Sequence, residues 1–157
     1  MARIKMEDKL ARTESFNAID QASKMMNETN DCSVKAAALA FGVQYRTAHD
    51  HFAANGRQPR RGTFRTAITL AKLANAIGMK MTRVNPQDFI DQYPKAHRIL
   101  RNVTTHHPKR FNKVWADGHT YIVFSRGHVG VVKNGVNHDW TVGRAMRVID
   151  IWRVESI

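Results

Sequence analysis

The chain is short of cysteine, of acidic residues and of long apolar runs, and each shortage excludes a class of protein. Its 157 residues include one cysteine, Cys32, so no disulfide forms within the chain, and we expect a reducing compartment such as the cytoplasm. No apolar run approaches the ~18 residues of a membrane span. The charged N-terminus also lacks the apolar stretch of a signal peptide. We therefore expect a cytoplasmic protein that does not enter a membrane.

Acidic residues are outnumbered by basic ones, 13 against 25, which gives a net charge of +12 at pH 7. Such a surface attracts polyanions, either nucleic acid or an acidic protein. The densest basic block contains Arg57, Arg60 and Arg61. We predict that this block is an exposed loop that binds an acidic polypeptide or a phosphate-bearing partner. Aromatic residues are not interleaved with the basic clusters, as a base-stacking surface would require.

The length and the 43% share of hydrophobic residues predict a single domain over residues 1–157 with a substantial core. Apolar residues at helical spacing fill the first half, and alternating apolar residues fill the last third. The expected helices cover residues 9–27, 32–41, 45–54, 64–77, 86–92 and 108–115. The expected strands cover residues 79–84, 121–125 and 147–154, with a hairpin at about 128–141. The prediction is an α+β fold, in which a helical N-terminal half packs on a small C-terminal antiparallel sheet.

The lone cysteine lies where a polar turn becomes an alanine-rich helix. Cys32 follows Asn30 and Asp31 and precedes the run 36–40, so its sulfur is expected in the first helical turn. Unpaired backbone N–H groups and the helix dipole favour a thiolate there. A buried and inert thiol is the alternative interpretation of a single cysteine.

The predicted hairpin brings a histidine and a carboxylate together. Asn134 and Gly135, flanked by apolar strands, predict a two-residue type I′ turn. In that register Gly130 faces Asp139, and Asp139 lies diagonal to His128 on the same face of the hairpin. An imidazole beside a carboxylate that orients it is the base that nucleophilic catalysis requires. His128 and Asp139 are therefore candidate partners of Cys32.

Several segments carry a resemblance to a known group of proteins. They are Asp31-Cys32-Ser33-Val34-Lys35-Ala36, Tyr45-Arg46-Thr47-Ala48-His49, Gly56-Arg57 with Arg61-Gly62-Thr63, and Arg126-Gly127-His128-Val129-Gly130-Val131-Val132 with Gly135-Val136-Asn137-His138-Asp139. Over about residues 28–140 the chain resembles small phage-encoded proteins that are similar to papain-like cysteine peptidases.

This resemblance implies a papain-like core over about residues 28–154, preceded by the N-terminal helix. It implies a thiol hydrolase in which Cys32 is the nucleophile, His128 the base and Asp139 the orienting carboxylate, acting on a polypeptide in the host cytoplasm. Where papain-like enzymes have a glutamine six residues before the nucleophile, this chain has Met26. Asn27, Asn30 or backbone N–H groups are the alternatives for binding the oxyanion, and a catalytically inactive relative is the other outcome.

A helix-turn-helix motif is the competing interpretation of the same region. Residues 37–49 form two helical stretches around Gly42, which matches the tight turn of DNA-reading motifs. The second helix would then present Gln44, Tyr45, Arg46 and His49 to the major groove. On this interpretation the protein is a basic nucleic-acid-binding or host-factor-binding protein without catalysis.

No cofactor and no metal are expected from the sequence. The histidine pairs 49/51 and 106/107 lack a second cysteine or an acid at ligand spacing. No glycine-rich phosphate-binding loop is present either.

Overall fold

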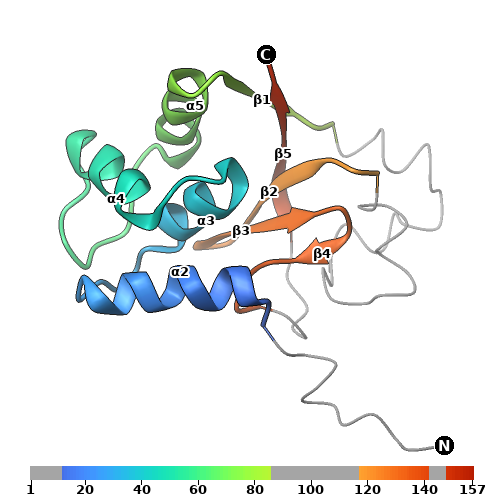
Figure 1. Ribbon diagram of the computed structural model, residues 1–157. Helices are drawn as coiled ribbons and strands as arrows, with labels where there is room; N and C mark the ends of the chain where they lie inside the picture. The colour runs from blue at the N-terminus through green and yellow to red at the C-terminus, as the bar shows by residue number, and fades with distance from the viewer. Residues whose placement is uncertain (1–11, 86–116, 142–147) are drawn as a thin grey trace, which may run out of the picture.

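The computed structural model describes residues 12–85, 117–141 and 148–157 (Figure 1). The first residues of the expected helix 9–27 and the whole of the expected helices 86–92 and 108–115 lie outside these described residues. Elsewhere the chain has helices first and strands last, as the sequence predicts. The helices are α2 (Glu14–Met25), α3 (Cys32–Phe41), α4 (Tyr45–Ala54) and α5 (Thr66–Ala76). The strands are β1 (Met79–Arg83), β2 (Thr120–Ser125), β3 (His128–Lys133), β4 (Val136–Asn137) and β5 (Val148–Ser156).

Local sequence signals set the helix ends. The side chain of Thr13 accepts a hydrogen bond from the backbone N–H of Phe16 at 3.2 Å, so α2 begins at Glu14. Gly42 follows the last residue of α3, and its left-handed φ of 66° ends that helix. The start of α2 and the end of α3 are therefore set by residues suited to those positions.

The strands form one antiparallel sheet in the order β1-β5-β2-β3-β4. Its register around the hairpin is the predicted one, because Lys133 pairs with Val136 and Val132 pairs with Asn137. Asn134 and Gly135 have φ values of 44° and 78°, as a type I′ turn requires. Regular pairing ends at Asn137, so β4 is shorter than expected.

The core lies between the helical layer and the sheet. Helix α3 is the central element, with α2, α4 and α5 beside it and strand β3 against it (Figure 1). Its buried alanines, Ala36, Ala37, Ala38 and Ala40, allow this close approach because they are small. Ile122, Val129 and Val131 from the sheet belong to the same apolar cluster. The start of α3 is thereby held next to β3.

The fold is α+β, with four helices and a five-stranded antiparallel sheet in the described residues. Among these residues no helix has the length and apolar character needed to cross a membrane.

Candidate active site

Cys32 is the first residue of α3, as the sequence predicts. The preceding residue, Asp31, occupies the N-cap position, but its side chain makes no capping hydrogen bond. Instead its Oδ2 accepts hydrogen bonds from Ser23 Oγ at 2.5 Å and from Tyr45 Oη at 2.6 Å. The N–H groups of the first helical turn consequently have no carboxylate cap beside the thiol.

His128 and Asp139 meet across the hairpin. His128 Nε2 lies 2.6 Å from Asp139 Oδ2. The carboxylate also accepts a hydrogen bond from Thr141 Oγ1 at 2.7 Å, and Asp139 itself is buried. This pair fixes the orientation of the imidazole and leaves Nδ1 as the ring nitrogen available to Cys32.

The electrostatics link the thiol to the imidazole. Burial would raise the pKa of Cys32, but hydrogen bonds to the His128 ring and the Val129 backbone, with the charge of the ring, lower it below the ordinary value of 9.0. Burial would likewise lower the pKa of His128, but hydrogen bonds to Asp139 and Cys32 raise it from 6.5 to about 9. Opposite shifts of this kind are those of a thiolate–imidazolium pair.

The pair opens into a pocket of about 400 Å³ between the helical layer and the sheet. Cys32 and His128 both line it. The other lining residues are Asn30, Ser33, Gly62, Thr63, Thr66, Phe124, Ser125, Gly127 and Val129. The pairing of β2 with β5 is irregular between Phe124 and Ser125, and such irregularities redirect side chains next to binding sites. The thiol is thus accessible from a cleft instead of being sealed in the core.

Two neighbours of His128 were not assigned a role from the sequence. Thr141 holds the Asp139 carboxylate, and its place two residues later on the same face is the signal that could have identified it. Strict alternation along the hairpin would place Trp140 on the face opposite His128, yet its ring lies 5.2 Å from the His128 ring at 63°. Because β4 ends at Asn137, strand alternation does not extend to this tryptophan.

The position of Arg57 differs from the expectation that the whole basic loop is exposed. Arg57 is only 7% exposed, and its Nη1 lies 3.0 Å from Glu28 Oε2. Arg60 and Arg61, in contrast, are exposed as expected. A buried guanidinium needs a buried carboxylate, and Glu28 comes from the loop between α2 and α3. Arg57 is therefore part of the internal structure, and the partner-binding prediction is retained only for Arg60 and Arg61.

The helix pair α3–α4 contains the predicted tight turn, but half of its expected DNA-reading residues point inward. Tyr45 is buried with its hydroxyl on Asp31. His49 Nε2 lies 2.5 Å from Glu28 Oε2. Gln44 and Arg46 are exposed.

No group of three or more His, Cys, Asp or Glu side chains in the described part of the chain is arranged to hold a metal ion. Comparison with protein-family models, with curated proteins and with solved structures gave no match. The function must therefore be argued from the site itself.

Proposed function

We propose that the protein is a papain-like cysteine hydrolase that cleaves an amide bond of a polypeptide. The observation that supports this best is the His128–Asp139 pair, 2.6 Å apart, at the wall of an open pocket that Cys32 also lines. A nucleophile, a base and a carboxylate that orients the base are the three groups that covalent acyl transfer needs.

The reaction proceeds in two halves. The Cys32 thiolate attacks the carbonyl carbon, and the electron pair of the C=O bond moves to oxygen. The tetrahedral intermediate collapses as the C–N bond breaks, and the His128 imidazolium gives its proton to the leaving amine. Neutral His128 then takes a proton from water as the hydroxide attacks the thioester. The second tetrahedral intermediate collapses as the C–S bond breaks, the acid is released, and the thiolate–imidazolium pair is restored.

The oxyanion is bound at the start of α3. Cys32 is the first residue of α3, so its backbone N–H has no partner within the helix and is available to the developing negative charge. Asn30 lines the same pocket; one N–H of its side-chain amide donates to the Arg60 carbonyl oxygen at 3.1 Å, and the second N–H is the donor for the oxyanion. Asn30 thereby takes the place of the glutamine expected at Met26, and Asn27 is not among the pocket residues.

The phage origin and the host cytoplasm as place of action are parts of the same proposal, and they rest on the sequence resemblance. The alternative, a non-catalytic nucleic-acid-binding protein, has less support. Tyr45 and His49 are engaged inside the protein, which leaves only Gln44 and Arg46 of the four expected base-reading residues on the surface.

Alkylation of the single cysteine tests the proposal. With iodoacetamide at pH 6, Cys32 should react at least about tenfold faster than an ordinary thiol, because its thiolate fraction is larger. His128→Ala should move the inflection of the pH–rate profile upward and abolish hydrolysis of fluorescent casein. His138→Ala is the matched control, since His138 contacts Thr13 at 3.0 Å on the other face of the hairpin.

The His138→Ala control should retain the pH–rate profile of alkylation and the casein hydrolysis of the wild type. Slow alkylation with the same pH profile in the wild type and in His128→Ala would contradict the proposal. An activated thiol without casein hydrolysis would identify the inactive relative instead.

A further inference from the structure

One wall of the pocket is the loop between α4 and α5, and it is fastened to the segment that carries the thiol. The backbone N–H of Arg60 donates to Glu28 Oε1 at 2.8 Å, and its carbonyl oxygen accepts from Asn30 Nδ2 at 3.1 Å. Three residues further, Thr63 Oγ1 lies 2.7 Å from Ser33 Oγ. These contacts hold the loop in a fixed position beside the start of α3.

Arg60 itself shows how firmly the loop is held. Its φ is 63°, a left-handed conformation that few residues other than glycine adopt. Such a conformation persists where surrounding contacts over-determine it, and here both backbone polar groups of Arg60 are bound. The arginine side chains of this loop therefore start from a fixed backbone.

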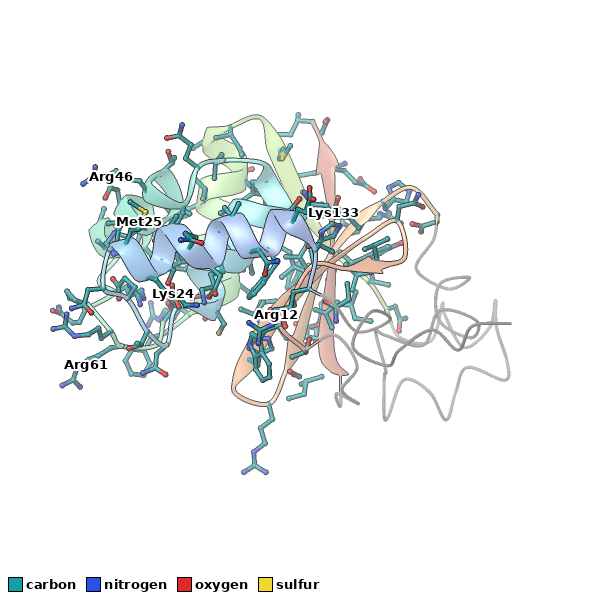
Figure 2. The ribbon with its side chains drawn as sticks, turned by 60° about the horizontal axis from the view of Figure 1, so that its bottom comes forward. Arg12, Lys24, Met25, Arg46, Arg61 and Lys133 are labelled. Carbon is teal, nitrogen blue, oxygen red and sulfur yellow. The ribbon has the colours of Figure 1, made fainter. Side chains whose placement is uncertain are left out.

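Exposed guanidinium groups flank the pocket on both sides. Arg60, Arg61 and Arg65 belong to the α4–α5 loop, and all three are exposed. Arg126 is exposed on the opposite wall, in the β2–β3 turn between the pocket residues Ser125 and Gly127. Within the described residues, none of these four arginines forms an ion pair with a carboxylate. Figure 2 shows the Arg61 side chain extending away from the ribbon.

Negative charge at the pocket is already neutralised from within. No carboxylate is among the pocket-lining residues. Glu28 and Asp31, which flank Asn30 in the sequence, and Asp139, which contacts His128, each have a basic partner: Arg57 for Glu28, Lys35 for Asp31 and His128 for Asp139. The unpaired arginines consequently dominate the field at the pocket mouth.

We infer, on the basis of the proposed function, that the substrate is an acidic polypeptide segment with Asp or Glu on both sides of the scissile bond. The loop arginines hold carboxylates on one side, and Arg126 holds a carboxylate on the other. A thiolate needs a carbonyl carbon to attack, which a nucleic-acid backbone does not offer. The chemistry of the site therefore favours an acidic polypeptide over a nucleic acid.

Two alkylating reagents of different charge measure the field at Cys32 directly. Iodoacetate is an anion and iodoacetamide is neutral, and both attack the same thiolate. The ratio of their rates cancels the thiolate fraction and reports the local potential. This ratio should exceed that of a cysteine in an unstructured neutral peptide, and it should fall toward that value in 1 M salt, where screening acts over ~3 Å.

Arginine variants locate the source of the field. A unit charge roughly 10 Å away in a water-like medium changes a rate by about twofold. We expect each of Arg61→Gln and Arg126→Gln to lower the rate ratio by about that factor, and the double variant to lower it further. Arg46→Gln is the matched control, because it removes the same charge from α4, on a separate part of the helical layer (Figure 2).

Protection of the thiol identifies the class of ligand. A blocked peptide of alternating Glu and Gly should slow the iodoacetamide reaction of the wild type. The alternating Gln and Gly peptide should not, and Arg61→Gln/Arg126→Gln should lose the protection.

The inference is overturned if the rate ratio equals that of the free peptide, or if Arg46→Gln lowers it as much as the pocket variants do. It is also overturned if oligothymidylate protects the thiol at lower concentration than the acidic peptide. These outcomes are independent of the proposed hydrolysis, because the ratio measures charge and not turnover.

Discussion

Gly130 lies opposite Asp139 and leaves the space that the carboxylate occupies. A Cβ at this position would come within 3.1 Å of Asp139 Oδ2 and 3.2 Å of Cγ. The same oxygen contacts His128 Nε2 at 2.6 Å. The absence of a side chain at residue 130 therefore determines how the histidine is oriented toward Cys32.

Gly130→Ala should disturb the triad while preserving the fold. The carboxylate has to move by a few tenths of an ångström, which lengthens its contact with His128. We expect the pKa of Cys32 to rise and its alkylation at pH 6–7 to slow several-fold, with a loss of stability of about 1 kcal/mol. The measurements are the pH–rate profile of alkylation and urea unfolding.

Val136→Ala serves as the control on the same hairpin, because Val136 is 47% exposed and pairs with Lys133 beside the turn. It should leave the alkylation profile unchanged. An unaltered profile in Gly130→Ala would show that the spacing of Gly130 and Asp139 does not govern the base.

At the scale of elements, Glu28 joins the loop before α3 to α4 and to the loop that follows it. Its carboxylate contacts Arg57, His49 and the backbone N–H of Arg60. Burial would raise its pKa, but hydrogen bonds to Arg57, the Arg60 backbone and His49 lower it from 4.5 to about 2. The folded state is thus stabilised by this carboxylate above pH 4.5 and loses that contribution as the pH falls through about 2.

Glu28→Gln should be strongly destabilising at pH 7, by about 3–5 kcal/mol, because it leaves the Arg57 guanidinium buried without a counter-charge. The deficit relative to the wild type should shrink as the pH falls from 4.5 toward 2. Urea unfolding at several pH values measures the loss of stability at pH 7 and its change with pH. Asp50→Asn removes a carboxylate whose side chain is 70% exposed and should cost less than about 1 kcal/mol. A deficit that does not depend on pH would contradict this role of Glu28.

Local signals explain which parts of the site could be predicted. Asn134 and Gly135 specify a turn by their own conformational preferences, and the turn sets the register that brings His128 to Asp139. Cys32 was placed because a helix start depends on its immediate neighbours. Both inferences need only residues close together in the sequence.

Non-local contacts explain why other parts of the structure could not be predicted from the sequence. The burial of Arg57 depends on Glu28, and the inward position of Tyr45 depends on Asp31. Nothing in the sequence around either residue indicates its partner. The order of strands, with β5 between β1 and β2, is likewise fixed only when the whole sheet assembles.

At the scale of the whole molecule, the raised pKa of His128 and the lowered pKa of Cys32 make the stability of the fold depend on pH in opposite senses. The raised pKa of His128 stabilises the folded state below pH 6.5, and that contribution is lost as the pH rises through about 9. The lowered pKa of Cys32 acts in the opposite sense, stabilising above 9.0 and losing its contribution as the pH falls. Between pH 6.5 and about 9 the folded imidazole holds a proton that the unfolded one lacks, and the lowered pKa of the thiol opposes the resulting pH dependence.

Cys32→Ser should expose the dependence of His128 alone. Asp139 still raises the pKa of the imidazole, so the stability of this variant should fall as the pH rises from 6.5, more steeply than that of the wild type. Urea unfolding at intervals between pH 6 and pH 9 measures the slope. The double variant Cys32→Ser/His128→Gln should lose this dependence of stability on pH. Parallel slopes for the wild type and Cys32→Ser would contradict an opposing contribution of the thiol.

His128, which lowers the pKa of Cys32, lies on a strand far along the sequence from the thiol. In most proteins a partly buried cysteine reacts only when the structure opens, and labelling therefore counts unfolded molecules. Here the relation is inverted below neutral pH, because the thiol's pKa is lowered only while β3 lies against the start of α3. Alkylation at pH 6 would count the molecules in which the two halves are assembled, and denaturant would slow the reaction.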